Sequence, residues 1–305
     1  MSVVSISTLA FYRQSQAQMS SLRGEAENLQ GQLASGERLS RSSDDPVAAS
    51  RVRSLQRAEQ LGEIDAANAA RASQDLQATG GALESIADDL IRVRELAVYA
   101  GSDTLGASQR EAIAIEIEEL RLRILSSANA TDSSGNALFG GEGSGAAYTL
   151  NASGTAIYAG TASSGTIDLG QGQSVVRGLT GPEVFNINGG GGPTDIFTEL
   201  AALSVALRGG AADPAATARD ALGTLDTALD TVTRAQTVTG ARADWLDIVQ
   251  DRQVDQSFAR TSEIADTGGV EFASTIAELQ QLLTVLEASQ ASFSRLSNLS
   301  LFNQI

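Results

Sequence analysis

The sequence of 305 residues contains no cysteine and no histidine. Zinc sites with thiolate or imidazole ligands, cysteine nucleophiles and Ser-His-Asp triads are therefore excluded. Aromatic residues are also scarce, at 4%, although 42% of the residues are hydrophobic. The apolar side chains are therefore chiefly Ala, Leu, Val and Ile, a composition that suits long helices packed side by side.

Lysine is absent as well, so all 21 basic residues are arginines, against 37 acidic residues and a formal net charge of −16. Nucleic acid is a disfavoured partner, because phosphate binding needs clustered positive charge. No apolar run approaches the roughly 20 residues that a membrane helix needs. The N-terminal stretch MSVVSISTLAFYRQ lacks the basic segment of a cleaved secretory signal. We expect no nucleic acid partner, no membrane span and no cleaved signal.

Apolar residues recur at three- and four-residue spacing in the first part of the chain, which predicts coiled-coil helices. The first helix is expected to end near Ser35, because Gly36 can adopt the left-handed conformation that closes a helix. The second should begin at Pro46 and end at Gly101, giving a rod of about 80 Å. A third helix follows, with its apolar face at Ile113, Ile117, Leu120 and Ile124.

Residues 133–193 have a different composition, since they hold 16 of the 30 glycines and show no helical periodicity. Short β-prone pieces such as AAYTL and TIDLG lie between glycine-rich turns, which predicts a small β-rich insertion.

Helical spacing returns from Ile196 to Leu207, and again after Asp213-Pro214 as far as about Glu263. The final tract carries one apolar stripe through Phe272, Ile276, Leu279, Leu283, Leu286, Gln290 and Phe293. A second stripe lies beside it, at Leu282, Val285, Leu296 and Leu299. A helix with two apolar faces needs more than one partner helix, which points to neighbouring subunits and so to a polymer.

The predicted fold is mainly α: a long antiparallel coiled-coil rod built from both chain ends, with a small β-rich inserted domain. Residues 1–45 and 263–305 would form terminal coiled-coil assembly arms, and 46–132 and 194–262 the helical rod. Residues 133–193 would be the glycine-rich β insertion. Isolated helices are marginal in water, so neither arm is expected to be stable alone.

The stretch QLASGERLSRSSDDPVAAS, residues 32–50, places two aspartates directly before a proline. Such a carboxylate can accept hydrogen bonds from free backbone N–H groups at a helix start, where proline lacks one anyway. Asp44 and Asp45 also lie at the positive end of the helix dipole. A catalytic pair is the alternative, but adjacent side chains point apart. We interpret Gly36, Asp44, Asp45 and Pro46 as a helix end, linker and helix start.

Two other patterns could suggest a metal site or a phosphate-binding loop, but neither has the features that such a site needs. The acidic group Glu116, Glu118 and Glu119 lies on a helix, whereas hard-cation sites usually draw ligands from a convergent loop. The glycine-rich GGEGSG at 140–145 has no following Lys-Ser/Thr, which a phosphate-binding loop requires. We interpret them as a solvated helix face and a loop, and expect no catalytic residue, no cofactor and no metal.

The segment 32–50 resembles the signature of the bacterial flagellin superfamily, in which a leucine-rich helix precedes Ser/Thr-Gly, a basic residue and an Asp-Asp-Pro helix start. DDLIRVRELAVYAGSDTLGASQREAIAIEIEELRLRI, at 88–124, is similar to that superfamily's central helix pair, and TGARADWLDI, at 239–248, to its Gly-Ala-Arg segment. SSGNALFGG, at 133–141, and LSNLSLFNQI, at 296–305, resemble the branch at the hook-filament junction.

The resemblance implies a structural, non-enzymatic role as an adaptor at the junction, templating flagellin assembly; the alternative is a filament flagellin that builds the filament itself. The implied partners are further copies in a ring or helical assembly, hook-associated protein 1, flagellin, and the flagellar export apparatus with an export chaperone. The implied location is the extracellular flagellum, after export without a cleaved signal peptide.

We expect the arms to fold as they assemble, because an apolar seam offsets the entropy of ordering only when neighbours cover it. The rod face toward adjacent subunits is expected at Arg92, Arg94, Glu95 and Glu116. The assembly contacts are expected at Leu22, Leu29, Leu33, Leu279, Leu283, Leu286, Phe293, Leu301 and Phe302.

Overall fold

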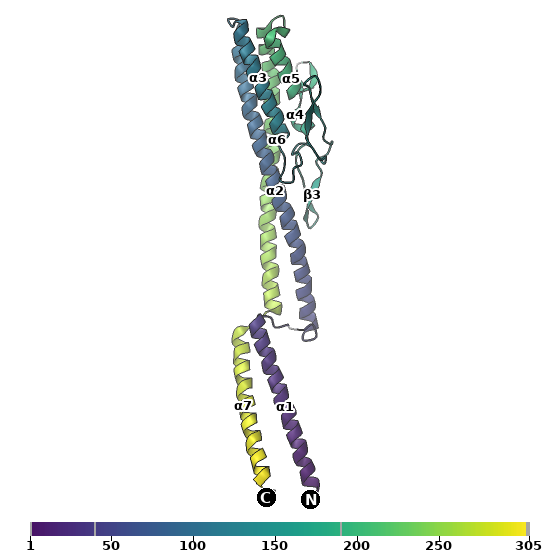
Figure 1. Cartoon of the computed structure of the whole chain (residues 1–305), viewed down its shortest axis with the longest axis vertical. Helices are drawn as coiled ribbons and strands as arrows, with labels where there is room; N and C mark the ends of the chain where they lie inside the picture. The colour runs from purple at the N-terminus through teal and green to yellow at the C-terminus, as the bar shows by residue number, and fades with distance from the viewer. Residues whose placement is uncertain (1, 40, 190, 303–305) are drawn as a thin grey trace. The chain divides into compact units, whose positions relative to one another are not determined.

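The computed structural model describes residues 2–39, 41–189 and 191–302, with side chains described for 10–39, 41–189 and 191–295 (Figure 1). The chain divides into two compact units. The first contains residues 1–60 and 256–305, and the second contains residues 61–255. The long helices α2 (Pro46–Ala100) and α6 (Pro214–Gly268) contribute to both units. No helix in the described ranges combines the length and apolarity that crossing a membrane requires.

In the first unit, α1 (Ser2–Ser35) and α7 (Phe272–Phe302) lie side by side and antiparallel (Figure 1). The ring of Tyr12 packs edge-on against that of Phe293, with centroids 5.3 Å apart. The helix α1 ends because Gly36 adopts φ +73°, a left-handed conformation that glycine tolerates at a helix terminus.

The first turns of α2 and the last turns of α6 complete this unit and are joined by ion pairs. Arg51 lies 2.6 Å from Glu263, and Arg260 donates to Glu59 at 2.7 Å. A hydrogen bond from the Ser257 hydroxyl and another from Arg260 lower the pKa of Glu59. These contacts fix the register of α2 against α6 near the connector.

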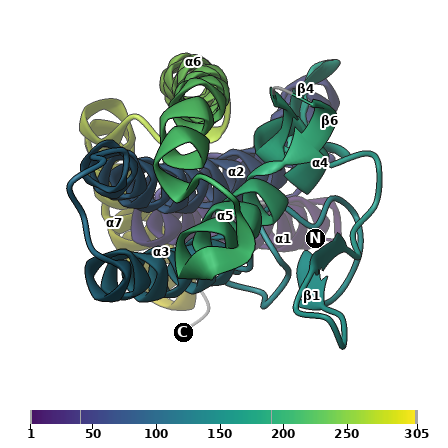
Figure 2. The ribbon, with the colours of Figure 1, turned by 90° about the horizontal axis from the view of Figure 1, so that it is seen from above.

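The second unit is a helical bundle with strands along one side. Its helices are α2, α3 (Ala107–Ala128), α5 (Ile196–Val205) and α6, and Figure 2 shows them gathered beside the hairpins. Leu83, Ile86, Leu90 and Val93 from α2 are fully buried, because their spacing places them on one helix face. They share one core with Ile117, Ile124, Phe197, Leu200 and Val232.

The insertion holds the short helix α4 (Gly181–Phe185) and three antiparallel hairpins. The hairpins are β1 (Tyr148–Leu150) with β2 (Ala156–Tyr158), β3 (Thr166–Gly170) with β4 (Gln173–Val176), and β5 (Asn186–Gly189) with β6 (Gly192–Asp195). Phe139, Phe185, Phe197 and Tyr148 pack together as a ring cluster that anchors it to the bundle. The predicted fold class is therefore confirmed, and the β-prone pieces AAYTL and TIDLG contain strands β1 and β3.

Two predicted helix ends were wrong. The helix expected to stop at about Glu263 continues to Gly268, since residues 264–267 contain neither proline nor glycine. The helix expected over 196–207 changes at Ala206 into a π-helical turn, Ala206–Gly210, in which Gly209 takes φ +96°. The three-part division into arms, rod and insertion stays a prediction. The unit with both chain ends extends beyond the predicted arms, to Gln60 and from Gln256.

Candidate assembly surfaces

The pair of α1 and α7 buries its apolar seam only in part. Among the described side chains of these two helices, only Ala26, Thr275 and Leu286 are buried. Of the other predicted contacts, Leu283 is exposed and the rest are half-buried, at Leu22, Leu29, Leu33, Leu279 and Phe293. The side chains of Leu301 and Phe302 lie outside the described residues. In a pair of helices, each helix covers only one side of the other. The apolar seam between them therefore remains accessible along its edges.

The face of α7 that meets α1 draws on both predicted stripes. Leu279, Leu286 and Phe293 of the first stripe and Leu282 of the second are buried or half-buried. Phe272 and Ile276 are exposed, and Leu283 is 37% exposed. The two adjacent stripes have similar hydrophobicity, and the packing against α1 selects a face that takes Leu282 and Leu286 rather than Leu283.

A groove of about 690 Å³ runs beside the seam. Its apolar lining includes Phe11, Met19, Leu22, Val285 and Phe293. Phe11 is 47% exposed and Val285 is 44% exposed. The arm pair therefore presents apolar surface on more than one side, as expected of helices that pack against further helices.

The connector, residues 36–45, is tied to the end of α6. Arg38 donates its backbone N–H to Gly268 O at 2.8 Å and its guanidinium to Thr267 O at 2.9 Å. Val270 N donates to Gly36 O at 3.0 Å, so the connector is also hydrogen-bonded to the short link between α6 and α7. The chain therefore leaves α1 and enters α7 at one fixed junction.

The two aspartates of the connector act on backbone N–H groups. Asp45 Oδ1 accepts from Ala48 N at 3.0 Å, which is the geometry of an N-cap, and Pro46 occupies the first turn. Asp44 Oδ2 accepts from Arg41 N at 2.9 Å, so it closes the turn before the helix. The two carboxylates thus serve different segments and do not converge as an acid-base pair would.

A second groove, of about 360 Å³, opens between this connector and the adjoining turns of α2 and α6; we call it the connector groove. Arg41 and Arg53 line it. Its apolar lining comes from Leu39, Ala49, Val52, Ile264 and Ala265. Among the described residues, neither arginine forms an ion pair with a carboxylate, and Arg53 donates to Ser42 Oγ at 3.0 Å.

The charged residues predicted for the rod face are exposed and pair within the chain. Arg92 on α2 reaches Glu116 on α3 at 2.7 Å and Glu95 at 3.0 Å. Arg94 reaches Asp226 on α6 at 2.6 Å. Hydrogen bonds to Glu116 and Glu95 raise the pKa of Arg92. Their positions remain available to a neighbouring molecule, since all of these side chains are about half exposed.

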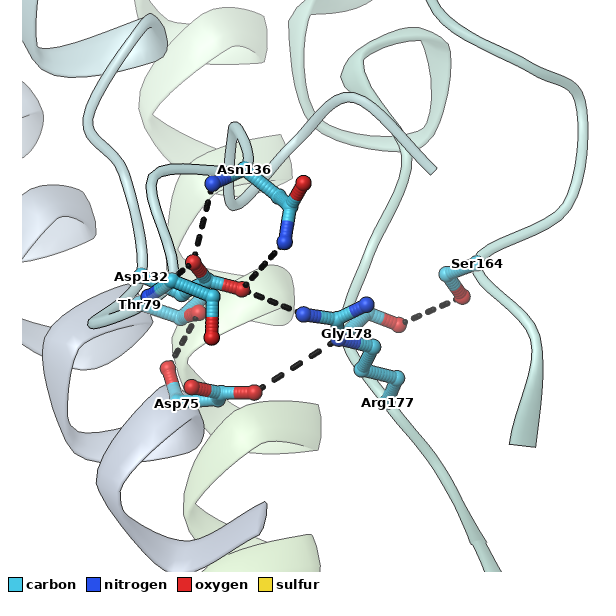
Figure 3. Close-up of polar contacts among 8 residues, drawn as sticks. Asp75, Thr79, Asp132, Asn136, Ser164, Arg177 and Gly178 are labelled. Carbon is cyan, nitrogen blue, oxygen red and sulfur yellow. Dashed lines mark hydrogen bonds and ion pairs between the residues drawn. The ribbon is translucent and has the colours of Figure 1, made fainter. Parts of the chain in front are cut away.

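A buried polar cluster, which we call the clasp, joins the insertion to the helices (Figure 3). Arg177 lies between two carboxylates, Asp75 of α2 and Asp132 after α3, and reaches Asp75 Oδ2 at 3.5 Å and Asp132 Oδ2 more closely. Asp132 also accepts from Asn136 N at 2.9 Å. The next carbonyl, Gly178 O, accepts from Arg242 of α6 at 2.7 Å. The helices α2 and α6 and the loop after α3 thus contact one stretch of the insertion.

The two carboxylates of the clasp have shifted pKa values in opposite directions. Burial raises the pKa of Asp75 because it penalises the charged form, although Arg177 opposes this. Burial also acts on Asp132, but hydrogen bonds from Asn136 and Ser134, together with Arg177, lower its pKa overall. Sequence reasoning missed this cluster. The signal available was Asp75 itself, a charge on an otherwise small and apolar helix face.

Within the described residues, no group of three or more Asp or Glu side chains is placed to hold a metal ion. Glu118, from the acidic group on α3, forms an ion pair with Arg121 at 2.6 Å. Arg121 also donates to Gly154 O of the insertion at 3.3 Å.

Residues 6–144 match the family model described as the bacterial flagellin N-terminal helical region. Flagellar hook-associated protein 3 of Escherichia coli (strain K12) is 26% identical over 312 residues, covering 97% of this chain and 98% of that protein. The protein of the same name from Salmonella typhimurium (strain LT2) is also 26% identical, over 313 residues with the same coverage.

Solved structures show the same fold. Flagellar hook-associated protein-3 from Legionella pneumophila aligns with a TM-score of 0.63 at 16% identity, covering 70% of this chain and 98% of that one. Bacillus cereus FlgL aligns with a TM-score of 0.57 at 20% identity, covering 70% and 99%.

Proposed function

We propose that the chain is a member of the bacterial flagellin superfamily and a structural subunit of the flagellum that forms the junction between hook and filament. The observation that carries this proposal is the similarity to hook-associated protein 3 over 97% of the chain, including both paired ends. A subunit with this role needs no catalytic residue, and we assign it no enzymatic activity. Its place is in the extracellular flagellum, reached by export without a cleaved signal peptide.

The half-covered arms support a mechanism of coupled folding and assembly. Complete burial of a Leu or Phe side chain contributes about 1.5–3 kcal/mol. Most described seam residues of α1 and α7 are only half-buried, so the paired arms gain a fraction of this. Additional helices in a tube would cover Phe11, Phe272, Ile276 and Leu283, and would supply the rest. The arms are therefore expected to be loosely folded in solution and ordered in the assembly.

The partners follow from a junction role. One side of a ring or short helical layer of this chain would contact hook-associated protein 1, and the other would present a template to flagellin. Arg92, Arg94, Glu95 and Glu116 are placed on the exposed surface of α2 and α3, where they can exchange partners with a neighbouring copy. The negative net charge opposes association in solution before an export chaperone delivers the chain.

A gene deletion tests the junction role. We expect cells that lack this chain to carry hooks without filaments and to release flagellin into the medium, and expression of the chain to restore attached filaments. Attached filaments in the deletion strain would overturn the proposal. Purified chain incubated with flagellin seeds should not extend them. Long filaments made of this chain alone would instead identify it as a filament flagellin.

A further inference from the structure

The connector groove has a chemical character that differs from the rest of this acidic chain. Its apolar lining, at Leu39, Val52 and Ile264, can receive an apolar side chain. The guanidinium groups of Arg41 and Arg53 at the groove lack a carboxylate partner among the described residues. Arginine at an apolar site is suited to pair with a carboxylate of an incoming chain. The groove therefore fits a segment that is apolar and acidic together.

A segment of this kind is exposed on α6. Phe258 is 75% exposed and Val254 is 67% exposed, which is unusual for large apolar side chains on a well-packed helix. Asp251 precedes Val254 by three residues and Phe258 by seven, and Asp255 precedes Phe258 by three, so all four share one helix face; both aspartates are exposed. Neither aspartate forms an ion pair with a described residue. We call residues 251–258 the α6 face.

We propose that the connector groove of one copy receives the α6 face of a second copy, with Phe258 against the apolar lining and the two aspartates beside Arg41 and Arg53. The inference rests on the proposed function, since it assigns the contact between neighbouring subunits of the junction. A groove and a knob at different places on one chain form a heterologous contact, which generates rings or helical layers. The arginines of the groove and the aspartates of the α6 face attract each other locally. The net negative charge of the chain otherwise makes its copies repel one another.

Charge complementarity selects a second copy as the occupant. Glu37 also lines the groove, so its two arginines exceed its one carboxylate. The α6 face supplies an aromatic group and two carboxylates on a stretch of two helical turns. Arg252 lies at the edge of this face, since it is 100° from Asp251 but only three residues from Asp255, so the face holds two aspartates against one arginine. Binding of flagellin or hook-associated protein 1 in the groove is a distinct outcome that the experiment below separates.

Disulfide cross-linking tests the contact, since the chain has no cysteine of its own. One variant carries Gln56→Cys, at the lining of the groove. Another carries Ser262→Cys, one turn from Phe258 on the exposed side of α6. The variants are expressed together in the deletion strain, filaments are counted, and isolated flagella are oxidised. Each chain then holds one thiol, so a cross-link can form only between copies.

We expect a dimer of the two variants on a non-reducing gel. Each variant expressed alone should give no dimer. Gln56→Cys paired with Thr233→Cys, a control at an exposed position nearer the N-terminal end of α6, should also give no dimer. Attached filaments that contain both variants and give no dimer would overturn the inference. A benzophenone on the cysteine of Gln56→Cys that attaches to flagellin or hook-associated protein 1, and not to this chain, would also overturn it.

A charge exchange provides a second test that does not depend on cysteine. We expect Arg41→Glu with Arg53→Glu to abolish attached filaments, and Asp251→Arg with Asp255→Arg to do the same. All four substitutions together should restore them, because each reversed charge again faces an opposite one. Filaments unaffected by either pair would contradict the inference. The junction role would still stand, provided that deletion of the whole chain removes the filaments.

Discussion

Replacing Arg177 by methionine should loosen the insertion from the helices, because this arginine stands between two buried carboxylates. The side chain of Asp75 is 6% exposed and that of Asp132 is 4% exposed. Removing one member of a buried ion pair leaves an uncompensated charge and costs about 3 kcal/mol. For a unit of this size, such a loss lowers Tm by about 6–12 °C. Methionine keeps much of the apolar stem, so the change mainly removes charge.

The loss of stability caused by Arg177→Met should depend on pH in a predictable direction. The pKa of Asp75 is raised by burial, so this group favours the folded state at low pH and loses that contribution as pH rises through its folded pKa. The lowered pKa of Asp132 acts oppositely, and its contribution is lost as pH falls through its folded pKa. Without Arg177 both carboxylates take up protons more readily. The loss of stability in Arg177→Met should therefore be largest near neutral pH and shrink toward about pH 4.

Trp245 provides the measurement. It is the single tryptophan of the chain and packs beside the small core that Leu169 and Val175 of the insertion share with the helices. Its fluorescence during thermal unfolding should report release of the insertion. Arg94→Met is the matched control, since Arg94 pairs with the exposed Asp226 and should cost less than about 1 kcal/mol. Equal losses in the two variants, or a loss that grows in acid, would refute this account of the clasp.

The helix limits near the connector could be predicted because their signals are local. Gly36 marks the end of α1 through its own left-handed backbone, and Asp45 caps α2 through a bond to a residue three positions away. Apolar periodicity likewise identified the core face of α2. These features depend on neighbours in the sequence, so the sequence alone contains the information.

The clasp could not be predicted because its members are distant in the chain. Arg177 and Asp132 are 45 residues apart, and Arg242 reaches a carbonyl 64 residues away. No periodic pattern relates such positions. The face of α7 that meets α1 could not be predicted for another reason. Its two stripes are similarly apolar, and the packing with α1, rather than composition, decides that Leu282 is covered while Leu283 is exposed.

Three further predictions address the connector, the insertion and the arms. Asp45→Ala removes the cap of α2 and should cost about 1 kcal/mol in thermal unfolding; a neutral result would show that the cap contributes little. Gly141→Ala should cost about 3 kcal/mol, because the new methyl group would lie 2.6 Å from Ser163 O at a left-handed position, whereas Gly135→Ala meets open space and should cost about 1 kcal/mol. Chemical denaturation of the two variants compares them. Finally, Leu286→Ala should lower arm helicity in the isolated chain, measured by circular dichroism, because Leu286 is buried against the seam and its truncation costs about 2 kcal/mol. Leu283→Ala should leave that helicity nearly unchanged, since Leu283 contacts solvent there, yet it should reduce filament attachment in cells as strongly as Leu286→Ala. A Leu283→Ala strain with normal filaments would show that neighbouring subunits do not cover this face of α7, and the proposed ordering of the arms by assembly would lose its physical basis.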